Sequence, residues 1–175
     1  MSDIYLSIGG NLEDRLKNIG LSQQAISDKI GHILDFSPIY ETEPWGFKHE
    51  RHFYNQVLRV QSDLAPEQVL KRCLYIEKSL GRERNASKNK NYAGRTMDID
   101  IIFYDDFIID KPALQIPHPD FKNRLFVLIP LNDIAPDFID PGSGKSIETL
   151  KENCSDTTSY KKTKLQGKQL HHETK

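Results

Sequence analysis

The fold is decided by residues 97–104, which read MDIDIIFY and give the clearest strand pattern in the chain. Apolar residues alternate with acidic ones at the start of this run, which predicts a strand with one face toward the core. The side chains expected to face the core are Met97, Ile99, Ile101 and Phe103. The carboxylates of Asp98 and Asp100 then project together from the opposite face, about 7 Å apart.

The other elements follow from the same kind of periodicity. Alternating patterns predict three more strands, over residues 3–8, 32–42 and 53–62. Apolar residues at helical intervals predict four helices, over residues 11–30, 66–80, 120–134 and 146–153. Strands joined by long loops and two-residue turns, mixed with helices of this length, indicate an α+β sandwich with a mostly antiparallel sheet.

Local signals refine the ends of these elements. Asn11 is the expected N-cap of the first helix, and Gly81 is the expected C-cap of the second. Pro38 indicates an edge position or a bulge in its strand. Pro130 is expected to kink or interrupt the third helix, because proline has no backbone N–H to donate.

Length and composition predict one globular domain, over residues 1–154, followed by a weakly ordered tail over residues 155–175. No apolar run is long enough to span a membrane, and no signal-peptide pattern is found, so we expect a cytoplasmic protein without a membrane partner. The net charge of −1 gives no general attraction to nucleic acid, and none is expected as a partner. The two cysteines, Cys73 and Cys154, have no metal-site spacing.

Charge is unevenly distributed around the strand at 97–104. Between Gly81 and Met97 five cations stand against one carboxylate, and residues 98–110 then carry five aspartates and no cation. Cations next to carboxylates suit a metal-bound polyphosphate, although a solvated charged loop beside a turn is the simpler alternative. The basic loop has few apolar residues, so we expect it to be mobile when empty and to close over a bound triphosphate.

The acidic pair and the arginines are candidates for the polyphosphate site. Asp98 and Asp100 would repel each other unless a cation such as Mg²⁺ compensates their charge. Arg82 and Arg84 could both bind one polyphosphate, or could only interact with the dipole of the preceding helix. Glu77, one turn earlier, either holds an arginine or is merely exposed.

A second group of residues suits a flat heterocycle. Phe53 and Asn55 share one strand face and combine an aromatic surface with an amide that both donates and accepts, although a core role for Phe53 is the simpler reading. His118 lies at a junction between a loop and a helix, followed by Arg124 and Phe126. These features alone name no substrate.

Six short segments form an ordered set: GGN (9–11), ETEPWG (41–46), FYN (53–55), GRER (81–84), GRTMDID (94–100) and PHPD (117–120). In order and approximate spacing they closely resemble the 6-hydroxymethyl-7,8-dihydropterin pyrophosphokinase family of folate biosynthesis, over residues 3 to about 153. The resemblance implies a ferredoxin-like α/β sandwich with helices on both faces. It also implies transfer of the β,γ-diphosphate of ATP to the hydroxymethyl oxygen of the dihydropterin, with two Mg²⁺ ions and release of AMP, by an enzyme expected to be a monomer.

The resemblance further implies roles for individual residues. The pterin-binding residues would be Thr42, Pro44, Trp45, Phe53, Asn55 and Phe126. The ATP-binding residues would be Glu77, Arg82, Arg84, Arg95, Ile99, His118 and Arg124. The catalytic residues would be Arg82, Arg84, Arg95, Asp98 and Asp100, of which the two aspartates hold the metal.

The chain departs from the common family pattern in three places. Its basic loop is longer than usual, Tyr92 stands where many members have Trp, and Pro119 stands where some have Tyr. The roles of Lys88, Lys90 and Tyr92 therefore stay open.

Two other classes of protein remain as alternatives. A catalytically silent ferredoxin-like module could bind RNA through the basic loop. A different metal-dependent nucleotidyltransferase would share the two aspartates, but would have no need for Phe53, Asn55 and Phe126. The three hypotheses are separated by whether the protein, given ATP, Mg²⁺ and the dihydropterin, releases AMP rather than ADP or free diphosphate.

Overall fold

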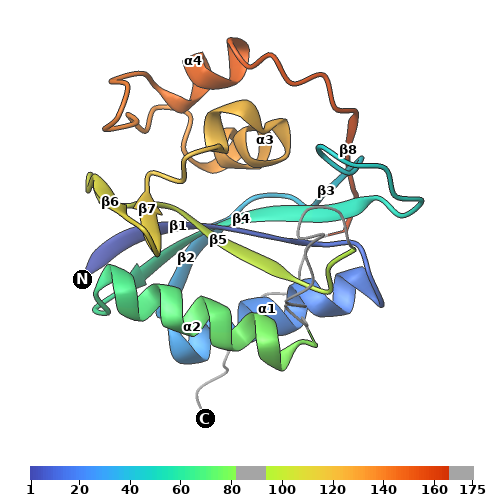
Figure 1. Cartoon of the computed structure of the whole chain (residues 1–175), viewed down its shortest axis with the longest axis horizontal. Coiled ribbons are helices and arrows are strands. Elements are labelled where there is room, and N and C mark those ends of the chain that lie inside the picture. The colour runs from blue at the N-terminus through green and yellow to red at the C-terminus, as the bar shows by residue number, and fades with distance from the viewer. Residues whose placement is uncertain (82–93, 166–175) are drawn as a thin grey trace.

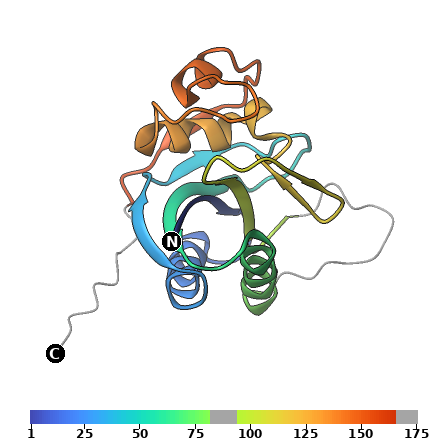
Figure 2. The ribbon, with the colours of Figure 1, turned by 90° about the vertical axis from the view of Figure 1, so that its left-hand side faces the viewer.

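The computed structural model describes residues 1–81 and 94–165, which form three layers (Figure 1). Helices α1 (Arg15–Lys29) and α2 (Pro66–Ser79) lie side by side under one face of a strongly curved sheet (Figure 2). Helix α3 (Leu125–Ile134) covers the other face, and α4 (Ile147–Glu152) lies against α3 on the side away from the sheet (Figure 1). The predicted α+β sandwich with helices on both faces is therefore confirmed.

In the described part of the chain the sheet has six strands, and their pairings are antiparallel. Its path runs β5-β1-β4-β3-β8, and β2 also pairs with β4. The strands are β1 (Ser2–Gly10), β2 (His32–Phe36), β3 (Tyr40–Thr42), β4 (Phe53–Ser62), β5 (Asp98–Tyr104) and β8 (Tyr160–Lys162). A separate hairpin consists of β6 (Ile109–Lys111) and β7 (Leu114–Ile116).

Two apolar cores lie on the two faces of the sheet, as the alternation of β1 requires. One face of β1 presents Ile4, Leu6 and Ile8 to the core under α1 and α2. The other face presents Tyr5 to the core under α3 and α4, where Val57 of β4 also lies. The two faces of the same strands are thus buried separately, and any polar site must lie beyond the end of one core.

A bulge in β5 changes the face of one predicted core residue. In the pairing with β1, Leu6 lies opposite Ile101 and Tyr5 lies opposite Phe103, so Ile102 is an extra residue on β5. Phe103 therefore packs in the core under α3 and α4, whereas Ile101 packs in the core under α1 and α2. The prediction that Phe103 shares a face with Ile99 and Ile101 is wrong, because a bulge shifts the alternation by one residue.

Two predicted elements end at other residues. Helix α1 has Asp14 as its N-cap and not Asn11, whose fully buried side chain instead accepts a hydrogen bond from the backbone N–H of Arg95 at 2.8 Å. The strand predicted over residues 32–42 is divided into β2 and β3 on either side of Ser37 and Pro38. Gly81, with a φ of +88°, has the left-handed backbone typical of a helix C-terminus.

The helix predicted over residues 120–134 is broken, but not at its proline. A short 3-10 helix, η1 (Phe121–Asn123), is separated from α3 by the extended backbone of Arg124. Helix α3 then contains Pro130 and continues to Ile134. The break at Arg124 leaves this residue at the N-terminal end of α3.

The segment expected to be a weakly ordered tail begins with an ordered stretch. Strand β8 pairs with β3 and extends the sheet by one strand. No sequence pattern predicts this pairing, because all three residues of β8 are exposed and show no alternation of apolar and polar residues. The boundary at residue 154 and the state of residues 166–175 stay predictions. Residues 82–93, with Arg82, Arg84 and most of the predicted basic loop, lie outside the described ranges.

A half-buried ion pair joins η1 to the loop before α4. Asp140, which is fully buried, accepts a hydrogen bond from the Ser143 hydroxyl at 2.5 Å and pairs with the Lys122 ammonium at 2.7 Å. Burial alone would raise the pKa of Asp140, but Lys122, Ser143 and the N–H of Gly142 outweigh it and lower this pKa below its ordinary value of 3.8.

We expect Asp140→Asn to lower the free energy of unfolding by about 1–3 kcal/mol at pH 7, because a charged acceptor is lost. A carboxyl whose pKa is lowered by folding stabilises the protein above its unfolded pKa, and this contribution disappears as pH falls through the folded pKa. Urea unfolding at pH 7 and at about pH 3 should therefore show a smaller difference between wild type and variant at the lower pH. An equal difference at both pH values would contradict the assignment.

Candidate functional site

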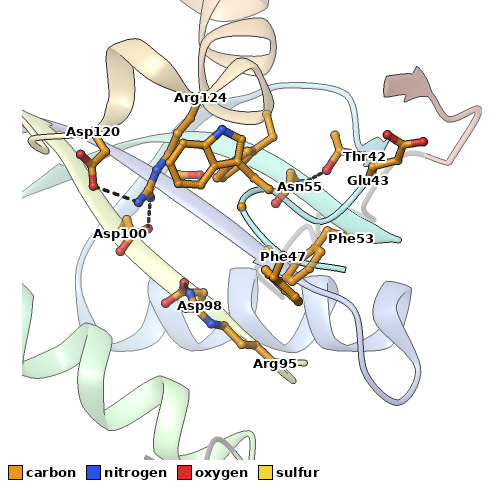
Figure 3. A pocket seen from close by; sticks show the side chains of 15 residues that line it. Thr42, Glu43, Phe47, Phe53, Asn55, Arg95, Asp98, Asp100, Asp120 and Arg124 are labelled. Atoms are coloured by element: carbon orange, nitrogen blue, oxygen red, sulfur yellow. Dashed lines mark hydrogen bonds and ion pairs between the residues drawn. The ribbon is translucent and has the colours of Figure 1, made fainter. Parts of the chain in front are cut away.

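A cavity of about 370 Å³ lies between the N-terminal end of α3 and the adjoining face of the sheet (Figure 3). It continues the sheet face that carries the core under α3 and α4. The predicted site residues that line it are Thr42, Trp45, Phe53, Asn55, Arg95, Asp98, Asp100, Arg124 and Phe126. They come from three strands of the sheet, the loop after β3, the stretch before β5 and the start of α3.

The size of the side chains along β1 opens this cavity. On one face of β1, Tyr5 fills the core, whereas Ser7 and Gly9 line the cavity. A Cβ atom at position 9 would lie only 2.1 Å from Oδ1 of Asn55. The glycine is therefore required if the Asn55 amide is to keep its place at the floor of the cavity.

Asn55 is fixed by a single neighbour on β3. Its amide nitrogen donates a hydrogen bond of 2.7 Å to the hydroxyl oxygen of Thr42, and both side chains are buried (Figure 3). The Cα atoms pair in the ladder so that Thr42 lies opposite Phe53, and Asn55 follows on the same face of β4. This arrangement holds the amide in one orientation beside an aromatic ring.

Four aromatic rings surround the apolar end of the cavity. Phe47 contacts Phe53 edge to face at a centroid distance of 6.1 Å, and Trp45 contacts Phe126 in the same manner at 6.4 Å. The guanidinium of Arg124 lies 4.9 Å from the centroid of the Trp45 ring. Aromatic faces at opposite sides of a cavity suit a flat, conjugated ligand.

The acidic pair lies at the polar end of the cavity. The side chains of Asp98 and Asp100 are 20% and 31% exposed, and both line the cavity as the alternation predicts. The guanidinium of Arg95 forms an ion pair with Asp98. Burial, followed by the charge of Asp98, raises the pKa of Asp100 to about 7, although Arg124 and Arg95 oppose this rise. A cation in the cavity would relieve this cost of ionising both carboxyls.

Arg124 connects the polar end to the loop before η1. Its guanidinium donates to Asp120 at 3.1 Å and lies 3.9 Å from Oδ2 of Asp100 (Figure 3). Its Nε atom is buried and has no hydrogen-bond partner among the described residues. A planar cation with an unused donor is suited to bidentate recognition of an anion.

His118 lies behind Asp100. Its Nε2 atom is 4.0 Å from Oδ2 of Asp100, and its Nδ1 atom accepts a hydrogen bond from the backbone N–H of Asp120 at 3.2 Å. Burial, and then the charge of Arg124, lowers the pKa of His118. The neutral imidazole therefore carries its proton on Nε2 and presents a donor toward the acidic end of the cavity.

Two predicted residues lie under the acidic pair. Glu77, at the end of α2, is 2% exposed and accepts a hydrogen bond of 2.8 Å from the backbone N–H of Ile99. The alternative that Glu77 is merely exposed is thus wrong. Ile99 itself packs in the core under α1 and α2, so only its backbone is near the acidic end.

The remaining predicted residues fall in other places. Pro44 lines a neighbouring open depression, together with Phe47 and the residues that follow it, and not the cavity. Arg82 and Arg84 lie outside the described ranges. The sequence patterns predicted no role for six further residues that line the cavity: Ser7, Gly9, Glu43, Gly46, Phe47 and Asp120. The alternation of β1 could have identified Ser7 and Gly9, whereas no local pattern points to Phe47.

Comparison with known proteins gives one family. Residues 5–136 match the family of 7,8-dihydro-6-hydroxymethylpterin-pyrophosphokinases (HPPK). The chain is 38% identical over 137 residues to a 2-amino-4-hydroxy-6-hydroxymethyldihydropteridine pyrophosphokinase of Porphyromonas gingivalis. The matched residues cover 78% of this chain and 92% of the relative. An enzyme of the same name from Aquifex aeolicus is 32% identical over 151 residues, which cover 86% of this chain and 91% of the relative.

Longer relatives contain a similar segment. The chain is 41% identical over 153 residues to the folic acid synthesis protein fol1 of Pneumocystis carinii, and these residues cover 87% of this chain but 20% of the relative. In three dimensions it resembles a crystal structure of Plasmodium falciparum HPPK-DHPS, wild type with pteroate, with a TM-score of 0.71 and 16% identity. This match covers 86% of the present chain and 44% of the other, and shows a shared fold.

Among the described residues, no helix has the length and apolar character needed to cross a membrane.

Proposed function

Since the chain belongs to the 7,8-dihydro-6-hydroxymethylpterin-pyrophosphokinase family, the ATP-using pyrophosphokinases of folate biosynthesis, we propose that the cavity is where the dihydropterin receives the diphosphate. The observation that carries this proposal is the division of one cavity into two ends. An amide and aromatic rings form one end, and carboxylates with arginines form the other. A pterin hydroxymethyl group placed between them would meet the triphosphate of ATP.

At the apolar end, the pterin ring would lie between Phe53 and Phe126. The Asn55 amide, held by Thr42, would bind the heterocycle edge, which carries both donors and acceptors. Trp45, which contacts Phe126 and is partly exposed, would cover the ring from solvent. Stacking and an oriented amide together select a flat molecule with a mixed hydrogen-bonding edge.

At the polar end, Asp98 and Asp100 would hold Mg²⁺ together with the phosphate oxygens. Among residues 1–81 and 94–165, no cluster of three or more His, Cys, Asp or Glu side chains could hold a metal ion by itself. Two carboxylates without a third protein ligand fit Mg²⁺, which typically keeps water and substrate phosphates in its coordination shell. When bound, the metal supplies neutralisation of phosphate charge. Two ions per ATP would match the pair of carboxylates.

The protein groups around the metal would position the reactants. Arg95 and Arg124 would neutralise phosphate oxygens, and His118 would donate from Nε2 to a nucleotide oxygen. No side-chain nucleophile is needed, because phosphoryl-type transfer depends chiefly on alignment and charge neutralisation. Arg82, Arg84, Glu77 and the backbone at Ile99 complete the proposed ATP site.

The test is to incubate the purified protein with ATP, Mg²⁺ and 6-hydroxymethyl-7,8-dihydropterin and to identify the nucleotide product. The proposal expects AMP and the dihydropterin diphosphate in equal amounts. ADP or free diphosphate would indicate another metal-dependent transferase or hydrolase. Absence of turnover with retained binding of single-stranded RNA would favour a binding module. A monomeric state and a cytoplasmic location remain predictions.

A further inference from the structure

The segment 155–163, called here the C-terminal strap, contacts both sides of the cavity. It lies beyond residues 5–136, which match the family. No sequence pattern predicted that this segment would pair with the sheet. Figure 1 shows the chain running from α4 past α3 to β8, which lies beside β3. Helix α3 carries Phe126, and β3 pairs with the part of β4 that carries Phe53, so the strap joins the two supports of the proposed pterin slot between these rings.

At α3, the strap supplies a carboxylate to the first turn of the helix. Oδ2 of Asp156 accepts a hydrogen bond of 2.9 Å from the backbone N–H of Leu125. The other oxygen, Oδ1, accepts from the N–H of Thr158 at 2.9 Å, which fixes the carboxylate. The first turn of α3 has no acidic residue of its own, and the side chain of its N-cap, Arg124, makes no capping bond with any described residue. Asp156 thus satisfies a free N–H at the positive end of the helix dipole.

At β3, the strap pairs with a strand of only three residues. Thr42 lies opposite Tyr160 in this ladder, and the N–H of Glu43 donates to the carbonyl of Ser159 at 3.3 Å. At the other end of the strap, the N–H of Thr163 donates to the carbonyl of Ile39 at 2.9 Å. These bonds hold β3, whose Thr42 side chain orients the Asn55 amide.

A third contact links β3 directly to α3. The ring of Tyr40 on β3 lies 6.2 Å from the ring of Tyr160. The hydroxyl of Tyr40 donates a hydrogen bond of 2.5 Å to Asp133 on α3. The strap, β3 and α3 therefore form a closed circuit of contacts around one side of the cavity.

We propose that the C-terminal strap sets the distance between the two sides of the pterin slot, with Asp156 as its positioning residue. The identity of the ligand rests on the proposed function, whereas the contacts of the strap with α3 and β3 do not depend on it. A flat ring between two aromatic faces needs supports that are already correctly spaced, because any reordering on binding reduces the affinity. Asp156 touches no substrate and acts only through the backbone of Leu125, next to Phe126.

The experiment compares Asp156→Ala with wild type by titration calorimetry and steady-state kinetics. Removal of a capping side chain should weaken dihydropterin binding by about five-fold, the equivalent of about 1 kcal/mol. Arg124, the residue before Leu125, is held separately by Asp120, so ATP affinity and kcat at saturating pterin should stay within about two-fold of wild type. Asp156→Asn keeps one acceptor oxygen and should recover part of the lost affinity. Glu152→Ala removes an exposed carboxylate of nearby α4 and should behave as wild type.

Trp45 provides a second measurement, which needs no ligand. It is the single tryptophan of the chain and lies 37% exposed against Phe126 and Arg124. In the empty Asp156→Ala protein, a displaced α3 should make the Trp45 fluorescence more accessible to acrylamide. Thr163→Pro, which removes the N–H bonded to Ile39 at the other end of the strap, should change pterin affinity and quenching in the same direction.

Three outcomes overturn the proposal. Wild-type pterin affinity and quenching in both strap variants would show that the strap positions nothing. Equal losses of pterin and ATP affinity, in step with a lower unfolding midpoint, would show a role in stability only. If wild type bound no dihydropterin, the proposed function would fail, and unchanged Trp45 quenching would still decide against the strap.

Discussion

Replacement of Asp98 or Asp100 by Ala is expected to lower turnover by about three orders of magnitude, while dihydropterin binding persists. Both carboxylates line the polar end of the cavity and belong to neither core, so their loss should leave the fold intact. A bound metal contributes several kcal/mol to neutralising the phosphate charge, and each 1.4 kcal/mol corresponds to about a tenfold change in rate. Initial rates of AMP formation at saturating Mg²⁺ provide the measurement.

A matched control is available at the end of the same strand. Asp106 is exposed in the turn after β5, so Asp106→Ala removes the same charge and should keep normal turnover. Thermal unfolding of all three variants checks that the fold is retained. Near-normal turnover of Asp98→Ala or Asp100→Ala would remove the metal role proposed for that residue.

The second large effect is expected for Asn55→Ala, which should weaken dihydropterin binding by about 1–3 kcal/mol, or roughly 5-fold to 150-fold. The pterin edge would lose its hydrogen-bond partner at the floor of the cavity. The Thr42 hydroxyl would also lose its donor, since the Asn55 amide is the group that bonds it. ATP affinity should change little, because the amide lies at the end of the cavity away from the carboxylates. Calorimetric titration with each substrate separates the two effects.

Gln56→Ala is the control for this variant. Gln56 is the next residue on β4, is equally buried, and accepts a hydrogen bond from Gln23 at 2.8 Å on the opposite face of the sheet. Its loss should lower stability but leave pterin affinity unchanged. If the two variants lost pterin affinity equally, the amide of Asn55 would not be the recognition group.

The sequence predicted the parts of the fold that depend on regular periodicity. Strand β4 has the predicted bounds of residues 53–62, and α2 ends one residue before its predicted limit of residue 80. The predictions were wrong where contacts between residues far apart in the sequence determine the local structure. Asn11 is a residue type that often caps helices, but its side-chain oxygen accepts a hydrogen bond from the backbone N–H of Arg95 instead. The bulge at Ile102 likewise depends on the pairing with β1, which alternation within β5 cannot reveal.

The candidate site was predictable to the extent that its residues lie in regular strands. Alternation placed Asp98 and Asp100 on one face of their strand, and Phe53 and Asn55 on one face of a second strand. The structure brings these four residues together in one cavity. The irregular loop after β3 gave no pattern from which Phe47 could be found. The roles of all these residues remain predictions that the variants above can test.

The hydrogen bond from Ile99 to Glu77 also affects how readily the edge of the sheet could pair with a strand of another molecule. Strand β5 is the last strand on its side of the sheet in the described part of the chain, and an edge strand is a ready template for a strand of another copy. The Glu77 carboxylate occupies an outward N–H of this edge, where an incoming strand would need to bond. An acidic residue buried at an edge thereby opposes the intermolecular β-pairing that leads to aggregation, directly beside the carboxylates of the cavity.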